Sequence, residues 1–135
     1  MKKYIFVFGF ICSLCTQAIA IPLKAPKTSD DVMLFSYKLL LVIYNFNYQN
    51  YLPRQKQAAT MFTGEGWDSF LTSLTKSRLI DSIKKNKYFV SVTPLSPPSI
   101  VDQGLKTGTY FWKVKQPAMV IYKNDTYQQV QYLNV

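Results

Sequence analysis

The spacing of the apolar residues changes once along this chain, near Tyr88, and no other feature limits the possible folds as much. Before that point, four large apolar residues occupy one helical stripe, at i, i+3, i+4 and i+7: Trp67, Phe70, Leu71 and Leu74. After it, the segment Tyr88 to Thr93 alternates and is rich in branched and aromatic residues, as strands are. Helices followed by strands predict an α+β domain, with N-terminal helices packed on one face of a bent antiparallel sheet.

Two stretches have the residue order of a helix start. At Thr28 to Asp31 a hydroxyl can cap the first free amides, and two carboxylates follow near the positive end of the helix dipole. At the second start Thr63 has the capping role, Gly64 takes the first helical position and Glu65 lies in the first turn. The second helix carries the apolar stripe, so we expect Trp67 to be buried and to contribute on the order of 2–3 kcal/mol as a structural anchor.

The run from Val32 to Tyr48 is apolar almost all round. It is short for a membrane span and contains Lys38, so we expect a helix that its own domain surrounds on most sides. A second membrane span is the alternative interpretation. Pro53 is expected to interrupt or restart this helix, and Leu79 to Ile83 predicts one or two further helical turns.

The second half of the chain contains further strand patterns. Beyond the first strand, the sequence predicts Ser99 to Gln103, Thr109 to Gln116, Ala118 to Lys123 and Tyr127 to Leu133. The stretch Pro94 to Pro98 is rich in proline and is predicted to be a loop. Because proline cannot donate to a ladder, Gln116-Pro117 is expected to mark a bulge or an edge in the sheet.

The first twenty residues have the order of a secretory signal peptide: Lys2 and Lys3, an apolar run from Tyr4 to Leu14, and then Ala18-Ile19-Ala20. Cleavage after Ala20 would leave a periplasmic protein that starts at Ile21. The alternative is an uncleaved inner-membrane anchor from Tyr4 to Ile21. Residues 21–28 contain two prolines and no periodicity and are predicted to be a linker, which leaves residues 29–135 as a single domain.

The residue inventory leaves little material for catalysis. The chain has no histidine, which excludes Ser-His-Asp triads and zinc sites that contain histidine. Cys12 and Cys15 lie within the signal segment, so cleavage would remove both thiols. Glu65 and Asp68 are three residues apart and remain as an acid-base pair, but a dipole partner and a solvated helix position explain them more simply. We expect no catalytic residue, no cofactor and no metal site.

The charge balance is basic. Without Lys2 and Lys3 the chain has fourteen basic and seven acidic residues, a net charge of +7. Such a surface favours anionic neighbours, whether lipid headgroups, cell-wall polymers, nucleic acid or acidic proteins. Lys113 and Lys115 alternate with apolar residues on one predicted strand, but two lysines are weak evidence for nucleic-acid binding. Peripheral contact with an anionic membrane or cell-wall surface is therefore an expectation, and specific nucleic-acid binding is not.

Three motifs follow one another along the chain: Phe46-Asn47-Tyr48-Gln49-Asn50-Tyr51, then Phe62-Thr63-Gly64-Glu65-Gly66-Trp67 with Phe70, then Trp112-Lys113-Val114-Lys115-Gln116-Pro117 with Tyr122. In this order they resemble the DotI/IcmL family of type IVB secretion systems and its conjugation relative TraM. The resemblance covers most of the chain after the signal segment. Gly64 stands where proline is common in the family pattern, and either residue suits a first helical position.

The resemblance implies an inner-membrane component whose periplasmic domain has the α+β cone of nuclear-transport-factor-like and VirB-type proteins. It also implies a non-enzymatic assembly part. The residues it carries over are structural: Thr63, Glu65, Gly66 and Trp67 at a helix start, with Trp112 and Pro117 in the sheet. Family members place a cytoplasmic tail and a membrane helix before this domain, whereas this chain begins with a signal-like segment, so a free periplasmic paralogue is a further expectation.

Two functions stay open. The first is a periplasmic protein-protein interaction or assembly component of a type IVB secretion or conjugation apparatus. Its partners would be other envelope proteins of the apparatus, with self-association as a further possibility. The alternative is a small-ligand-binding protein or a histidine-free enzyme on the same fold. It requires an open cavity that holds a carboxylate of raised pKa, such as Glu65 or Asp68.

Overall fold

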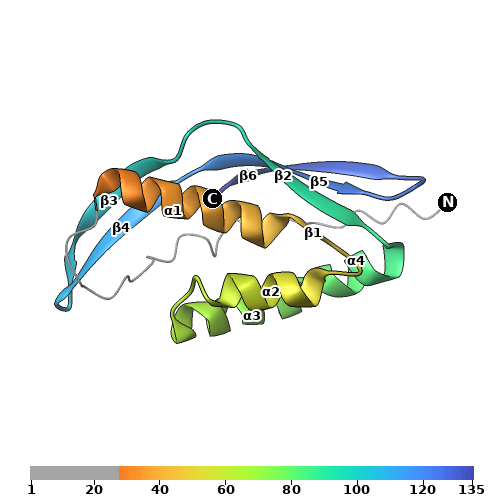
Figure 1. Ribbon diagram of the computed structural model, residues 1–135, viewed down its shortest axis with the longest axis horizontal. Helices are drawn as coiled ribbons and strands as arrows, with labels where there is room; N and C mark the ends of the chain where they lie inside the picture. The colour runs from red at the N-terminus through yellow and green to blue at the C-terminus, as the bar shows by residue number, and fades with distance from the viewer. Residues whose placement is uncertain (1–27) are drawn as a thin grey trace.

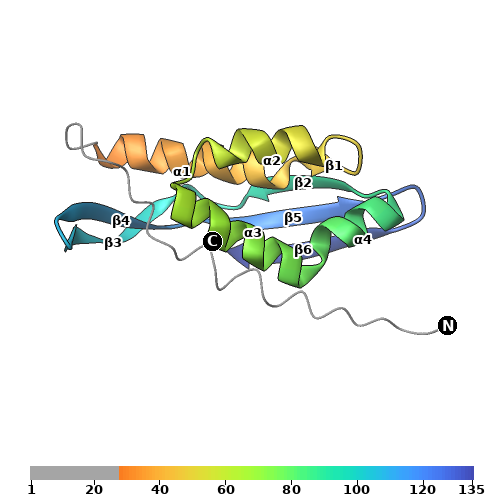
Figure 2. The same cartoon turned by 90° about the horizontal axis from the view of Figure 1, so that it is seen from below.

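The computed structural model describes residues 28–135 and places helices on one side of a larger antiparallel sheet, with a smaller sheet at one end (Figures 1 and 2). The helices are α1 (Ser29–Tyr44), α2 (Tyr51–Ala59), α3 (Gly64–Ser77) and α4 (Leu79–Asn86). The strands are β1 (Phe46–Asn47), β2 (Phe89–Pro94), β3 (Ser99–Lys106), β4 (Thr109–Lys115), β5 (Pro117–Lys123) and β6 (Gln128–Asn134). The predicted α+β class, with helices before strands, is confirmed.

The strands form two sheets where the sequence predicted one. The larger sheet has the order β1-β2-β5-β6, and β3 pairs with β4 in the smaller one. The chain passes directly from β4 to β5 through Gln116, so the division falls between two strands that are consecutive in sequence. β5 is an interior strand, but Pro117 is its first residue, and proline's missing amide donor is tolerated at that position. Of the bulge or edge predicted at Gln116-Pro117, the structure has the boundary between the two sheets there, and the register shift lies in β3 between Ile100 and Asp102.

The start of α1 follows the prediction, but its end does not. The Thr28 hydroxyl accepts a bond from the Asp31 amide, and the Asp31 carboxylate accepts one from the Thr28 amide, each at 3.2 Å. The helix stops at Tyr44, short of the predicted Tyr48, because Asn45 turns its side chain to the sheet and accepts a bond from the Val92 amide at 3.0 Å. Pro53 lies in the first turn of α2, where proline is tolerated, so the chain restarts a helix there as predicted.

The length of the helices bears on the membrane-span interpretation. The longest described helix, α1, has 16 residues, and no helix within residues 28–135 is long and apolar enough to cross a bilayer. The predicted signal segment lies outside the described residues.

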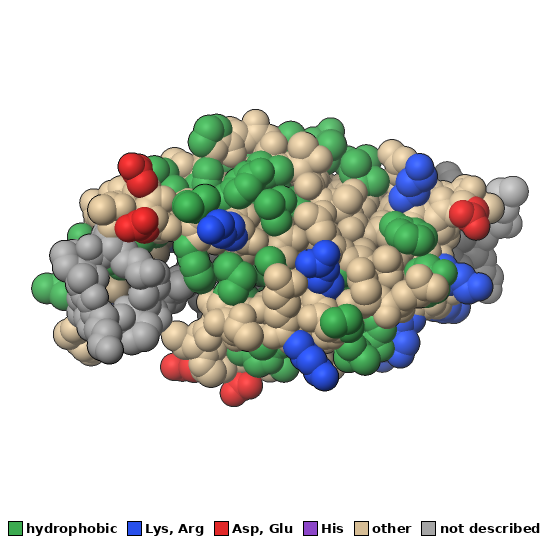
Figure 3. All heavy atoms as spheres, in the orientation of Figure 1, with side chains coloured by type: hydrophobic (Ala, Val, Ile, Leu, Met, Phe, Trp, Pro, Cys, Tyr) green, Lys and Arg blue, Asp and Glu red, His purple; other side chains and the backbone are tan. Residues whose placement is uncertain are grey.

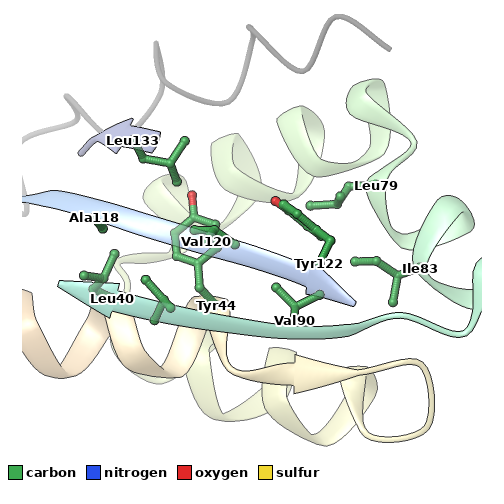
Figure 4. Packing of buried hydrophobic residues seen from close by; sticks show 10 residues of the cluster. Leu40, Tyr44, Leu79, Ile83, Val90, Ala118, Val120, Tyr122 and Leu133 are labelled. Atoms are coloured by element: carbon green, nitrogen blue, oxygen red, sulfur yellow. The ribbon is translucent and has the colours of Figure 1, made fainter. Parts of the chain in front are cut away.

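The core lies between the larger sheet and two of the helices (Figure 4). Leu40 and Tyr44 come from α1, and Leu79 and Ile83 come from α4. They pack against buried residues of β2, β5 and β6: Val90, Val92, Ala118, Val120, Tyr122 and Leu133. These strand residues alternate with exposed or half-buried neighbours, so one face of the sheet is in the core and the other carries no helix.

Candidate functional site

The motif around Thr63 forms the start of α3. The Thr63 hydroxyl oxygen accepts a bond from the Gly66 amide at 3.1 Å, and the Trp67 amide donates to the Thr63 carbonyl at 2.8 Å. Gly64 is the first helical residue, and Glu65 lies exposed in the first turn, as the sequence predicted. A Cβ on Gly66 would lie 3.0 Å from the Thr63 hydroxyl oxygen, whereas one on Gly64 would meet nothing within 4 Å. Gly66 therefore has a steric role in the cap.

The two glycines provide a matched pair of substitutions. Gly64→Ala is expected to raise the free energy of unfolding by about 0.5 kcal/mol, because alanine favours the helix and the site is open. Gly66→Ala is expected to give no gain, because its methyl group crowds the oxygen that caps the helix. Urea unfolding followed by circular dichroism measures both values. Equal gains for the two variants would show that the cap does not depend on Gly66.

Three aromatic rings cluster at this helix start. The ring centroids of Phe62, Trp67 and Phe70 lie 5.4–5.5 Å apart. All three side chains are only half-buried, and α3 contains no buried residue. The expectation that Trp67 is a buried anchor is therefore wrong. The reason is that α1 and α4 supply the buried helix residues of the core, while α3 reaches it only through the half-buried Leu74, and Phe70 and Leu74 line a cleft between the helices.

The motif that begins at Trp112 starts in the smaller sheet and continues into β5. Trp112 on β4 is 7% exposed, and its ring lies 4.6 Å from that of Tyr110. Lys113 and Lys115 are exposed on the opposite face of the strand, as expected from the alternation, and Lys113 stands across from Asp102 in the ladder. α1 contacts both β3 and β4, and Trp112 is the one buried residue of β4.

Gln116 is a residue to which the sequence analysis gave no role of its own. Its side chain is 1% exposed, and its backbone exchanges two hydrogen bonds with Val135, of 2.6 and 3.2 Å. The Ser36 hydroxyl on α1 donates a long bond of 3.4 Å to the Gln116 side-chain oxygen. Gln116 thus links the junction of the two sheets to the C-terminal residue and to α1. Its position at the end of one predicted strand and directly before a proline was the signal available in the sequence.

A cleft lies between the helices. It is lined by twelve residues, among them Val42, Ile43, Phe70, Leu74 and Ile80, and its volume is about 30 Å³. That volume holds two or three water-sized spheres at roughly 10–15 Å³ each, whereas a drug-sized ligand needs roughly 300 Å³ or more. The cleft therefore has no room for an organic ligand of ordinary size.

The two acid-base candidates lie away from this cleft. Glu65 and Asp68 are both exposed, and no carboxylate is among the lining residues. The described residues also contain no group of three side chains that could hold a metal ion. The cavity with an internal carboxylate that a pocket enzyme requires is therefore not formed by this cleft.

One titratable group has a distinct environment. Burial, and secondly the neighbouring Tyr127, raise the pKa of Tyr88 above its ordinary value of 10.0. The centroids of the two rings lie 6.2 Å apart. The phenol is therefore protonated at neutral pH and cannot serve there as a base.

Comparison with known proteins decides the family. The sequence profile for the DotI/IcmL proteins, described as an inner-membrane complex component of the type IVb secretion system, matches residues 15–135. The chain belongs to the DotI/IcmL family. No curated protein sequence matches this DotI/IcmL chain.

Solved structures agree with this membership. The periplasmic domain of DotI is 27% identical to this chain and superposes with a TM-score of 0.78. The match covers 82% of this chain and 79% of the DotI chain. An IcmL-like type IV secretion system protein from Legionella pneumophila subsp. pneumophila strain Philadelphia 1 is 29% identical, with coverages of 80% and 75% and a TM-score of 0.69. A periplasmic fragment of TraM shares the fold at 23% identity, with 79% of each chain covered and a TM-score of 0.71.

Large apolar side chains are exposed at several places on this DotI/IcmL chain: Leu34 and Tyr37 on α1, Leu52 on α2, Phe89 on β2, Val101 and Leu105 on β3, Val130 and Tyr132 on β6, and Leu95 and Tyr127 between strands. On α1, Leu34 and Tyr37 are exposed, and Figure 3 shows apolar side chains gathered over this helix. Val130 and Tyr132 are exposed on β6, on the sheet face that has no helix. Basic side chains spread from the centre of the face in Figure 3 toward its right-hand end, while most carboxylates lie toward the left.

Proposed function

We propose that this chain is a non-enzymatic assembly component of a type IVB secretion or conjugation apparatus and acts in the periplasm through contacts with other envelope proteins. The observation that carries the proposal is the match to the periplasmic domain of DotI over 82% of the chain with a TM-score of 0.78. Family membership supports the apparatus, and the similarity to a periplasmic domain supports the compartment.

The geometry supports contact rather than catalysis as the mode of action. The motif residues Thr63, Gly66 and Trp112 have structural roles, in a helix cap and in the packing of the smaller sheet. The interhelical cleft is small and contains no carboxylate. Exposed apolar groups on α1 and β6 are available as contact surfaces.

The proposal is tested by crosslinking the tagged protein in intact cells and identifying the captured proteins by mass spectrometry. We expect proteins of the secretion core from a strain with an assembled apparatus, and their loss from a matched strain that lacks it. Recovery of the protein without other components of the apparatus in both strains would contradict the assembly role.

Location is tested separately by intact-mass measurement of the exported protein. We expect Ile21 as the first residue, because small residues at Ala18 and Ala20 suit signal cleavage. The fraction that contains the protein should be the periplasm. A mass that retains Met1, found with the inner membrane, would establish the anchored form instead.

The non-catalytic assignment predicts that the carboxylates are dispensable. Glu65→Gln and Asp68→Asn, alone and together, are expected to leave secretion or conjugation efficiency unchanged. Loss of the favourable charge near the helix N-terminus should reduce the free energy of unfolding by no more than about 1 kcal/mol for Glu65→Gln. Efficiency is measured by effector translocation or plasmid transfer in a strain that carries each variant. Loss of function in a folded variant would reopen the catalytic interpretation.

A further inference from the structure

The open edge of the larger sheet at β6 is a feature that the functions above do not use. β6 pairs with β5 and ends the strand order, and Figure 2 shows it at the margin of the sheet. It is seven residues long, from Gln128 to Asn134, and contains neither proline nor a charged residue. Proteins usually protect such edges with lysines, prolines, bulges or very short strands. β6 has none of these, whereas β1, at the other edge, has only two residues.

Hydrogen bonding along β5 and β6 identifies the backbone groups that face the open edge. Gln116 exchanges bonds with Val135 at one end of the pair, and the Asn124 amide donates to the Tyr127 carbonyl at the other. Bonded and non-bonded residue pairs alternate in an antiparallel ladder. The odd-numbered residues of β6 therefore bond to β5. The even-numbered residues direct their N–H and C=O groups outward: Gln128, Val130, Tyr132 and Asn134.

The side chains of these four residues lie on the helix-free face of the sheet. Val130 is 39% exposed and Tyr132 is 70% exposed. Val130 stands directly across from Ile121 on β5, and Tyr132 across from Met119. Two short rows of apolar side chains therefore run up to the edge and end there, next to backbone groups that pair with no other strand within residues 28–135. Such a border is suited to a further strand with apolar side chains on the same face.

We infer that β6 pairs with β6 of a second copy of this chain, antiparallel about a two-fold axis at Gln131, so that one sheet continues through both molecules. This register places Val130 across from Tyr132 of the second copy, and Gln128 across from Asn134. Any shift of register would leave residues at the ends of the strand unpaired. The amide side chains of glutamine and asparagine are both donors and acceptors, so they can pair with their own kind.

Charge favours a second copy at this edge over the edges of the smaller sheet. The chain is strongly basic, with a formal net charge of +9, so most self-contacts bring lysines together. Self-pairing along the smaller sheet would involve strands that carry Lys106, Lys113 and Lys115. β6 brings no charge to such a contact. A two-fold pairing also closes on itself and covers both β6 edges. The inference rests on this sheet and does not require the secretion role.

Sedimentation velocity and light scattering of the purified exported protein test the inference over about 1–100 µM, a range that covers micromolar dissociation constants. We expect a reversible dimer. The double variant V130K/Y132K should raise the dissociation constant at least about tenfold, because lysines on an edge oppose strand pairing. S91K/T93K is the matched control, since both residues are exposed on β2 and pair with Ile121 and Met119 of β5, away from the β6 edge. It should dimerise like the parent protein, and circular dichroism should confirm that both variants fold.

A cysteine experiment tests the register. In chains with Cys12 and Cys15 replaced by serine, V130C and Y132C should form a disulfide dimer when mixed and oxidised, and much less when each is alone. S91C mixed with Y132C should give no such product. A monomer at all concentrations, a dimer that V130K/Y132K does not weaken, or one that S91K/T93K weakens equally would overturn the inference. A V130C dimer without the mixed product would overturn the register at Gln131.

Discussion

Trp112→Ala is expected to lower the free energy of unfolding by about 3–5 kcal/mol, one of the two largest effects that we predict. The Trp112 side chain is 7% exposed and packs on Tyr110, so its removal leaves a large cavity beside Tyr110 on the buried face of the smaller sheet. Typical domains are stable by only about 5–15 kcal/mol. The variant should therefore unfold at a much lower urea concentration, measured by circular dichroism.

Trp67→Ala is the matched comparison. Its ring is stacked with Phe70, lies tilted against Phe62 at the helix start and is half-buried, so we expect a loss of roughly 1–2 kcal/mol. Trp112→Phe keeps most of the buried volume and should lose less than Trp112→Ala. Equal losses for Trp67→Ala and Trp112→Ala would contradict the difference in packing between the two motifs.

Ile83→Ala is expected to lower the free energy of unfolding by about 2–5 kcal/mol, because the Ile83 side chain is 0% exposed and lies in the core. Leu71 on α3 provides the control, since it is half-buried and belongs to the stripe that the sequence analysis expected to anchor the helices. Leu71→Ala should cost about 1–2 kcal/mol. Urea unfolding of both variants measures the difference. If Leu71→Ala lowered the free energy of unfolding more than Ile83→Ala, the packing of α3 rather than of α4 would contribute most to holding the helices on the sheet.

The sequence predicted local structure well because local chemistry determines it. The Thr28 and Thr63 caps, the restart at Pro53 and the alternation in β5 depend on residues within a few positions of one another. The end of α1 was harder to predict. Asn45 stops the helix through a bond to Val92, which is 47 residues away in the sequence.

The burial of Trp67 and the division of the sheet could not be predicted for a different reason. An amphipathic stripe shows that a helix has an apolar face, but neighbouring side chains can cover that face as well as a core can. Similarly, burial alternates without interruption from Trp112 through Gln116 to Ala118 and Val120. Alternation specifies which side of a strand is covered, but not which strand lies beside it, so the change of pairing at Gln116 leaves no trace in the pattern.

That change of pairing affects how the molecule can open. β4 and β5 are nearly one continuous stretch of extended chain, but their ladders belong to separate hydrogen-bonded systems. Backbone amides in the hairpin of β3 and β4 can therefore exchange with solvent without breaking a bond of the larger sheet, as in separate cooperative units. Motion of that hairpin reaches the rest of the domain through the covalent strand and through α1, which contacts both systems.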